Sequence, residues 1–397
     1  MNLVVTLEHR FDRAPDGTIW TQGADKYSFW ERYLDVFDNV QVVARAREVT
    51  SAPPNSQRAD GELVSFLHLP CFIGPKQFLM SLREIRRRIN ASYSKEASFI
   101  AHAPSAICTL MLKELNRRGH PYGLEVISDP CDIFAPGVLQ HPLRPFFRWW
   151  FSRNLARQCA NADAASYVTE FALQRRYPCK GFSVGISDVD LPGKAFVDSP
   201  RHRANVDADA TIVFVGALEQ KYKAAHVLID AVAACSKSGL GLKLLMVGDG
   251  RYRTELEARA RALGLAENVI FKGQLLAGAQ VREQLDKADL FVLPSLTEGL
   301  PRAMVEAMAR GLPCLGTSVG GIPELLLEED TVPPGDSIAL AEKILEVLSD
   351  PRRLSLMSER NLDKARRYSD QLLHDKRIAF YSYVRDFTEM WLAREES

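Results

Sequence analysis

The sequence predicts an α/β protein made of two doubly wound domains. Short β-rich apolar runs alternate with segments of helical periodicity along both halves of the chain, a pattern typical of parallel sheets with crossover helices. At 397 residues the chain is longer than one hydrophobic core usually organises. Between the halves, residues 187–208 contain Pro, Gly and Asp without periodicity, and we interpret them as a linker.

The alternation is more regular in the second half. The strands expected there are 211–216, 242–247, 269–273, 289–294 and 313–318, and the expected helices are 223–238, 251–264, 278–287, 301–311 and 338–349. The first half predicts strands at 2–7, 40–45, 62–67, 97–102, 122–128 and 163–169 and helices near 28–37, 75–91, 105–118 and 143–160. We therefore expect domains at 1–190 and 206–370, and a long amphipathic helix within 371–397.

Composition narrows the class of protein. Lys+Arg and Asp+Glu both number 50, so no overall basic field favours nucleic acid as a partner. The seven Cys are scattered without zinc spacing, which is typical of reduced thiols in a cytoplasmic protein. The start, MNLVVTLEHRFDR, is interpreted as a strand and not as a signal peptide. No apolar stretch reaches the roughly 18 residues that a membrane span needs.

The segment 294–324 carries the most chemical information. Pro301 suits the first position of a helix, where its missing N–H costs nothing. Glycine at 299 lets a ligand approach the N–H groups of Gly299, Leu300 and the helix start, and such a positive helix end suits a phosphate group. Glu298 lies just before the helix, and Glu306 nearly two turns into it.

Periodicity alone leaves a second interpretation of Glu306 open. Arg302, Glu306 and Arg310 share one helical face at i,i+4 spacing. A solvated ladder of ion pairs, each worth about 0.2–0.5 kcal/mol, would explain that arrangement without any ligand.

The same segment, PSLTEGLPRAMVEAMARGLPCLGTSVGGIPE, resembles the signature of the retaining glycosyltransferases of family 4. The matching features are two Glu separated by seven residues (298 and 306), Ala-Met-Ala (307–309), Gly-x-Pro (311–313) and Gly-Gly-x-x-Glu (320–324). The likeness extends upstream through VGAL (215–218), YKAAHVLIDA (222–231), VGDGRYRTELE (247–257), FKGQL (271–275) and DLFVLPS (289–295). It implies the GT-B fold: two Rossmann-like domains facing a cleft, with the acceptor on the first, the donor on the second and the last helix returning to the first.

The resemblance also implies roles for single residues. Glu298 matches the carboxylate that contacts the hydroxyls of the transferred sugar, and Glu306 the one that holds the ribose hydroxyls. Lys223 stands where the family places a cation on the diphosphate, with backbone donors from Gly299, Leu300 and Pro301. The other donor-side candidates are Gly216, Lys221, Gly248, Asp249, Gln274 and Leu275.

Within that set, Gln274 and Leu275 stand where main-chain groups of the family usually contact the nucleobase. Ala217 replaces an Arg that is common in the family, and Lys221 is the candidate substitute. Gly248-Asp249-Gly250 is equally explained by a plain turn between strand and helix.

The implied chemistry is a retaining sugar transfer from a UDP- or GDP-linked donor, with no cofactor. Departure of a nucleoside diphosphate places negative charge on phosphate oxygen, which fixed cations and N–H groups stabilise without demanding a metal. A nearby carboxylate can stabilise the oxocarbenium-like sugar.

Acceptor-side candidates are Gly23, His102 and Asp129. His102 follows a predicted strand at a place where the family often carries a His, although a lone His there can be purely structural. Asp129 stands where many relatives have another His, so the proton acceptor is not identified. Gly23 would belong to a loop after the first strand that lets an acceptor approach the diphosphate, or simply to a surface loop.

Two segments combine cations with large apolar side chains: FLMSLREIRRRIN (78–90) and HPLRPFFRWWFSRNLARQ (141–158). Helices of this composition can lie in the headgroup layer of an anionic membrane. The alternative is that the aromatic rings are buried in the core and only the Arg side chains are solvated. Peripheral contact at the inner face of the plasma membrane would make a lipid-linked glycan the natural acceptor, and family resemblance favours surface polysaccharide assembly.

Three rival functions are compatible with parts of the pattern. A sugar-nucleotide epimerase or hydrolase of the same architecture is disfavoured by the paired Glu with Lys223. A dinucleotide-dependent oxidoreductase lacks G-x-G-x-x-G after the first strand. A non-catalytic sugar-nucleotide-binding relative is disfavoured by the intact Glu298 and Glu306, whereas Ala217 leaves it open.

Overall fold

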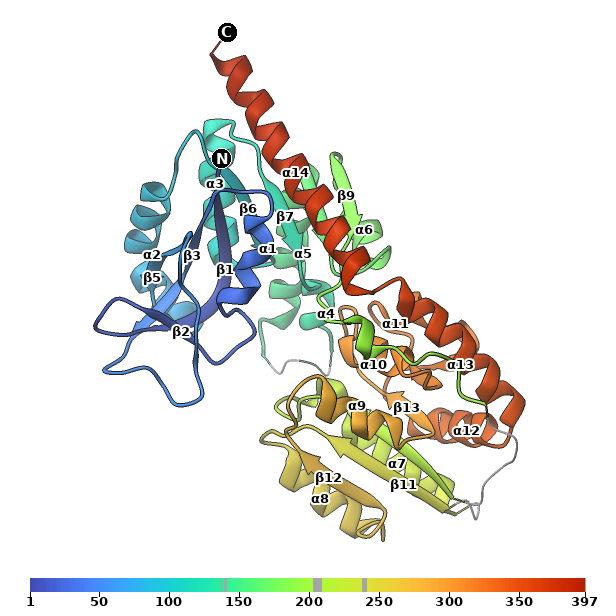
Figure 1. Cartoon of the computed structure of the whole chain (residues 1–397). Helices are drawn as coiled ribbons and strands as arrows, with labels where there is room; N and C mark the ends of the chain where they lie inside the picture. The colour runs from blue at the N-terminus through green and yellow to red at the C-terminus, as the bar shows by residue number, and fades with distance from the viewer. Residues whose placement is uncertain (137, 139–140, 203–208, 238–240, 397) are drawn as a thin grey trace. The chain divides into compact units, whose positions relative to one another are not determined.

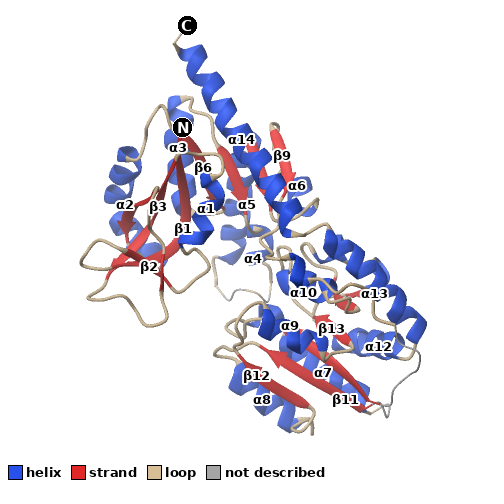
Figure 2. Cartoon of the chain, in the orientation of Figure 1, coloured by secondary structure: helices blue, strands red, loops and turns tan. Residues whose placement is uncertain are grey.

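A computed structural model describes residues 1–136, 138, 141–202, 209–237 and 241–396 (Figure 1). The chain forms two compact units. The first contains Met1–Pro130, Trp149–Ile186 and His374–Ser397, and the second contains Cys131–Arg148 and Ser187–Leu373. In each unit, strands are flanked by helices (Figure 2). The predicted fold class, two α/β domains with parallel sheets, is confirmed.

The first unit is built on one large sheet. Its strands are β1 (Asn2–Arg13), β2 (Ile19–Thr21), β3 (Asn39–Glu48), β4 (Gln57–Arg58), β5 (Val64–Pro70), β6 (Ser98–Ala103), β7 (Gly123–Val126), β8 (Ala164–Tyr167) and β9 (Phe182–Gly185). The parallel strands run in the order β5-β3-β1-β6-β7-β8-β9, and β2 and β4 add an antiparallel corner to β1. Sequence periodicity misses β2 and β4 because strands of two or three residues are too short to show alternation.

Helices cover this sheet and close its core. They are α1 (Tyr27–Leu34), α2 (Gly74–Ala91), α3 (Ala106–Arg118), α5 (Arg144–Asn161) from Trp149 onward, and α6 (Ala172–Arg176). Phe99, Met111 and Leu124 are buried in one apolar cluster between strands and helices. A short helix, α4 (Pro130–Ile133), lies where the chain passes from one unit to the other.

The last helix returns to the first unit, as predicted. From His374 onward, α14 (Asp370–Glu395) belongs to that unit (Figure 1). Phe380 and Tyr381 are buried. A Cβ atom on Gly123 of β7 would come within 2.7 Å of Val384, so the absence of a side chain there lets β7 and α14 pack closely.

The second unit has a fully parallel sheet in the order β12-β11-β10-β13-β14-β15. These strands are β10 (Asp209–Val215), β11 (Gly241–Val247), β12 (Val269–Gly273), β13 (Leu290–Leu293), β14 (Cys314–Thr317) and β15 (Thr331–Val332). The helices are α7 (Ala225–Ser236), α8 (Arg253–Ala262), α9 (Ala279–Asp286), α10 (Arg302–Ala309), α11 (Ile322–Leu325), α12 (Ser337–Leu348) and α13 (Pro351–Arg366). The central strands β10, β13 and β14 are buried on both faces, which explains their continuous apolar sequences.

The described part of the predicted linker is attached to the second unit. Residues 203–208, which include the predicted domain start at 206, lie outside the described residues. Before them, Val197 N–H donates to Ala309 O at 3.0 Å, and Arg201 N–H donates to Ser358 Oγ at 2.8 Å. Composition predicts that this segment is irregular. It does not predict these hydrogen bonds, because they depend on which helices of the second unit the segment packs against. Within the described residues, no helix is long and apolar enough to cross a membrane.

Candidate functional site

The candidate donor residues gather at the carboxyl edge of the second sheet. Because its strands are parallel, the segments that follow β10, β11, β12 and β13 all leave from this edge, where ligands of open α/β sheets bind. Lys223 ends the 3₁₀ turn Lys221–Lys223 after β10, and Glu298 lies in the loop after β13.

Lys223 and Glu298 form the centre of the site. Lys223 Nζ lies 2.6 Å from Glu298 Oε1, and Ser295 Oγ donates to the same oxygen at 2.6 Å. The Glu298 side chain is 7% exposed and that of Lys223 16%, so the pair is largely removed from water. Leu296 N–H donates to Tyr222 O at 2.7 Å and thereby ties the two loops together. The tertiary structure thus joins a cation and a carboxylate that the resemblance assigns to diphosphate and sugar.

The paired glycines of the motif hold the Glu298 loop in place. Gly320 has φ +54°, and a Cβ there would lie 1.8 Å from Glu298 O. Gly321 N–H donates to Gly299 O at 2.7 Å. Any side chain at Gly320 would therefore displace the main chain that carries Glu298.

The N–H groups beside Glu298 are available for a ligand. The helix expected over 301–311 covers Arg302–Ala309, so Pro301 is the N-cap residue and not the first helical one; its ψ of 101° keeps it extended. Within the described chain, the N–H groups of Gly299 and Leu300 donate to no protein acceptor. Two such donors at the start of a helix are compatible with the expected anion site, which stays a prediction.

Glu306 does not belong to an ion-pair ladder. Arg310 instead binds Asp286 with two hydrogen bonds, Nε–Oδ1 at 2.7 Å and Nη2–Oδ2 at 2.9 Å. Among the described residues, Glu306 makes no side-chain hydrogen bond or ion pair. Burial raises the pKa of its carboxyl, opposed by the weaker influence of Arg302 and Arg282. The ladder interpretation is therefore wrong. The half-buried carboxylate of Glu306 has no hydrogen-bond or ion-pair partner among the described residues.

The glycines that end β10 and β11 bring two loops into backbone contact. Gly248 has φ +134°, and a Cβ on it would lie 2.0 Å from Gly216 O. The stem of Lys223 passes 3.6 Å from the Cβ position of Gly216. Asp249 is used locally: Oδ1 accepts from Gly250 N–H at 2.8 Å and Oδ2 from Arg253 Nη1 at 3.0 Å. Both contacts are local, so a plain turn accounts for Asp249. That Asp249 contacts the sugar donor stays a prediction.

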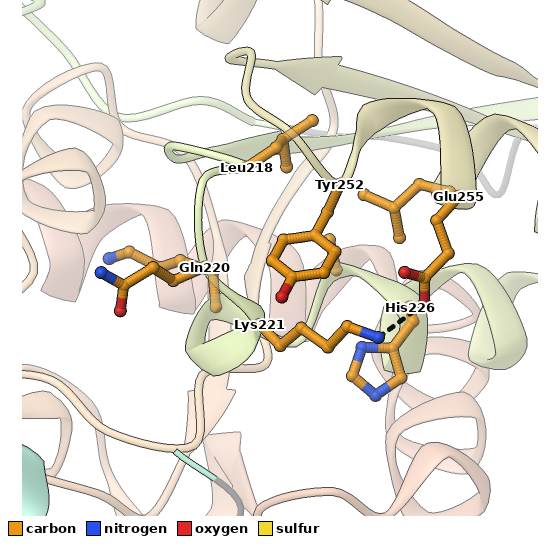
Figure 3. Close-up of a pocket in the computed structure, with 9 residues that line it drawn as sticks. Leu218, Gln220, Lys221, His226, Tyr252 and Glu255 are labelled. Carbon is orange, nitrogen blue, oxygen red and sulfur yellow. Dashed lines mark hydrogen bonds and ion pairs between the residues drawn. The ribbon is translucent and has the colours of Figure 1, made fainter. Parts of the chain in front are cut away.

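Lys221 points away from Glu298. Its Nζ lies 2.8 Å from Glu255 Oε1 and 4.9 Å from the centre of the Tyr252 ring. Figure 3 shows this ammonium group turned toward Glu255, with the His226 ring nearby, in a small pocket. Since the lysine already has a carboxylate partner, it is poorly placed to replace the cation absent at Ala217.

The main chain after β12 is open to a ligand. Gln274 is exposed, and its Nε2 makes only a long contact of 3.4 Å to Leu275 O. Neither Gln274 nor Leu275 makes a hydrogen bond between backbone groups in the described residues outside the strand ladder. Apart from that long contact to Leu275 O, these main-chain groups are compatible with binding a base, as the resemblance implies.

The acceptor-side candidates in the first unit have protein partners. His102 Nε2 lies 2.6 Å from Glu125 Oε2, and the hydroxyls of Tyr33 and Tyr381 donate to Glu125 at 2.9 and 3.1 Å. Burial alone would raise the pKa of Glu125, but His102, Arg32 and Tyr33 hold it at about 2. This cluster joins α1, β6, β7 and α14, which favours a structural role for His102; its acceptor role stays a prediction.

Asp129 is likewise engaged. It forms an ion pair with Arg176, and Tyr177 Oη donates to its Oδ1 at 2.6 Å. The carboxylate is buried, so a role at the acceptor would require these contacts to change.

Gly23 packs against His9, a residue that the sequence analysis missed. A Cβ on Gly23 would lie 2.7 Å from His9 Cε1. His9 Nδ1 lies 3.2 Å from Asp25 Oδ2, and Nε2 lies 3.0 Å from Thr21 Oγ1. The charged residues that follow Leu7 in the first strand were the sequence feature that could have pointed to His9. The end of β2 and the loop after it thus pack around a histidine of β1. In the second unit, Ser295, which donates to Glu298, is the residue that the sequence analysis did not single out.

Exposed apolar side chains lie beside cations on α2 and α5. Leu79 is 66% and Met80 78% exposed on α2, and Trp149 is 58% and Trp150 41% exposed on α5. Burial of all these rings in the core, the alternative considered above, is therefore wrong for the two tryptophans. The exposed cations of α2 that make no ion pair within the described residues are Lys76, Arg83 and Arg86.

Comparison with known proteins agrees with this arrangement. Residues 209–350 match the family model described as glycosyl transferases group 1. Protein CapJ of Staphylococcus aureus is 26% identical over 374 residues, 93% of this chain and 92% of that protein. A putative colanic acid biosynthesis glycosyltransferase, WcaL of Escherichia coli K12, is 30% identical over 262 residues, 62% of this chain and 60% of that protein.

The fold also has solved counterparts. Alr3699/HepE of Anabaena, solved in complex with UDP and glucose, superposes with a TM-score of 0.63 at 18% identity, covering 95% of this chain and 98% of that one. Such a low identity establishes the fold alone. Together with the family match over 209–350 and the motif from Glu298 to Glu324, it leads to one conclusion: residues 209–350 match the group 1 glycosyl transferases, and the chain has the GT-B fold.

Proposed function

We propose that this glycosyltransferase moves a sugar, with retention of configuration, from a UDP- or GDP-linked donor to a glycan acceptor during assembly of a surface polysaccharide. The observations that carry the proposal are the Lys223–Glu298 pair and, eight residues after Glu298, Glu306, whose carboxyl has no hydrogen-bond or ion-pair partner among the described residues. The name of WcaL, a putative colanic acid biosynthesis glycosyltransferase, supports a polysaccharide product, and the UDP and glucose in the HepE complex support the donor class.

In this proposal each group meets one part of the donor. Glu306 accepts hydrogen bonds from the two ribose hydroxyls. Lys223 and the N–H groups of Gly299 and Leu300 stabilise the charge that develops on the leaving diphosphate. Glu298 orients the sugar hydroxyls and stabilises positive charge on the sugar ring. These groups supply the needed charge themselves, so we propose that neither metal nor cofactor takes part.

The role of Glu306 is tested by titrating nucleoside diphosphates into the wild type and Glu306→Gln. We expect the variant to bind UDP or GDP more weakly by roughly 1–3 kcal/mol, because a charged hydrogen bond to the ribose is lost. The wild-type affinity should also fall as the pH drops through the raised pKa of this carboxyl, since only the carboxylate accepts both hydroxyls. The variant should lose that pH dependence.

Two readouts decide the proposal. Release of nucleoside diphosphate from a panel of nucleotide sugars, in the presence of glycan acceptors, should occur with a UDP- or GDP-sugar. Interconversion of the sugar without transfer would favour the epimerase, and binding without turnover would favour a non-catalytic relative. Calorimetry that finds the same affinity and pH profile in Glu306→Gln would mean that the ribose assignment is wrong.

We further propose a cytoplasmic enzyme that associates peripherally with anionic membrane through the exposed residues of α2 and α5, and a lipid-linked glycan acceptor. Leu79 and Met80 provide apolar area for insertion, and Lys76, Arg83 and Arg86 provide cations without competing partners. Arg87 and Arg88 contribute less, because both bind Glu84. The free thiols of all seven cysteines are compatible with a reducing compartment.

Vesicle flotation tests this surface. Replacing Lys76, Arg83 and Arg86 together by Glu should lower partition onto phosphatidylserine vesicles by roughly two orders of magnitude or more, at about 1 kcal/mol per cation removed. A matched control reverses three exposed cations of the second unit, Lys237, Lys243 and Arg261. Equal flotation of the two triple variants would refute the assignment.

A further inference from the structure

An arginine on α9 extends over the loop that follows β12. The guanidinium of Arg282 folds back toward Gly278, with Nη1 and Nη2 at 3.7 and 3.8 Å from the position that a Cβ would take on that glycine. Gly278 has φ +90°, which marks a tight turn into the helix. Gln274 and Leu275 belong to the same short loop, and in the described residues their main chain makes only the long contact from Gln274 Nε2 to Leu275 O. Arg282 therefore borders the open stretch of backbone.

The same arginine lies within electrostatic range of Glu306 but forms no ion pair with it in the described residues. α9 packs against α10, which carries Glu306. Arg282 is close enough to lower the pKa of that carboxyl against the effect of burial, yet no ion pair joins them. Arg282 makes no side-chain hydrogen bond to any described residue, whereas Lys287, the C-cap residue of the same helix, binds Glu283 at 2.6 Å.

These contacts leave a half-buried cation and a half-buried carboxylate on two helices that pack against each other. Partly buried charges without protein partners lose hydration and gain nothing in return. A polar ligand between them would satisfy both: its hydroxyls can donate to Glu306, and its oxygen acceptors can receive hydrogen bonds from Arg282.

We propose that Arg282 is a donor-binding residue that recognises the nucleobase and selects a base with a ring carbonyl, uracil or guanine, against adenine. This inference rests on the nucleotide-sugar donor proposed above. A guanidinium has only donors, so it pairs with carbonyl oxygen, and in guanine also with N7. Adenine presents an amino group where guanine has its carbonyl, and that donor opposes the arginine.

Calorimetric titration of the full-length protein with UDP, GDP, ADP and inorganic pyrophosphate tests the assignment. For Arg282→Ala, we expect affinity for the preferred diphosphate, UDP or GDP, to fall by about ten- to hundredfold. Affinity for ADP and pyrophosphate should stay within about twofold, because neither offers a carbonyl. Arg282→Lys should recover only part of the loss, since lysine keeps the charge without the planar fork.

Lys287→Ala is the matched control, because it removes one cation from the same helix and should bind like the wild type. Unchanged affinity of Arg282→Ala for UDP and GDP would overturn the proposal, as would an equal loss for pyrophosphate, which would assign the arginine to the diphosphate. A wild type that binds none of the nucleotides would instead refute the proposed donor class, and the inference with it.

Discussion

Replacing Glu298 by Gln is expected to lower turnover by roughly two to three orders of magnitude while nucleoside diphosphate binding stays nearly unchanged. The carboxylate receives hydrogen bonds from Lys223 and Ser295 at 2.6 Å each, and glutamine keeps the shape and one acceptor oxygen. What the variant loses is the negative charge beside the sugar that becomes positive in the transition state. Steady-state rates and calorimetry on the same preparation separate the two effects.

Glu328→Gln serves as the control for this experiment. Glu328 is an exposed acidic residue of the same unit, outside the motif, and its neutralisation should change neither rate nor affinity. A Glu298→Gln enzyme with more than about a tenth of the wild-type rate would show that this charge is not used in the chemical step.

Removing Lys223 is expected to affect both stability and binding. Lys223→Met leaves the Glu298 carboxylate, 7% exposed, with Ser295 as its remaining partner. Breaking a buried pair from one side typically costs about 3–5 kcal/mol, and the exposure of Lys223 places the expected loss toward the lower end of that range. The diphosphate should also bind much more weakly, because its cation is gone. Urea unfolding and calorimetric titration measure the two quantities.

A double variant separates the two roles of Lys223. In Lys223→Met with Glu298→Gln no buried charge is left unpaired, so stability should largely return while diphosphate binding remains weak. Recovery of binding together with stability would mean that Lys223 acts only by pairing with Glu298. Lys221→Met is the matched single control: its ion pair with Glu255 is half exposed, so its loss should cost less than about 1 kcal/mol and leave binding intact.

Much of the fold can be predicted from residues that are close together in the sequence. β10, β13 and β14 are buried on both faces along most of their length and contain continuous apolar runs, so they can be predicted without a structure. The shorter strands, such as β4, pair through main-chain groups and carry no periodic signal. The motif from Glu298 to Glu324 is likewise contiguous, so its family could be identified from sequence.

The tertiary structure decided which charged side chains pair with one another. Lys223 and Glu298 are 75 residues apart, and only the adjacency of β10 and β13 in the sheet brings them to 2.6 Å. The i,i+4 spacing around Glu306 predicted a ladder, but Asp286 on a neighbouring helix binds Arg310 instead. Similarly, His102 pairs with Glu125, although its position at the end of a strand had suggested a role at the acceptor site.

The physical reason is the difference in range between the two kinds of information. Alternation, helix starts and glycine turns depend on residues within a few positions of one another, so the sequence by itself determined two α/β domains and a glycosyltransferase-like motif. Which charges are paired depends on strand order and helix packing, contacts between residues far apart in the chain. The structure alone therefore decided that Glu298 is paired, that Lys221 is occupied by Glu255, and that Glu306 and Arg282 are left without protein partners among the described residues.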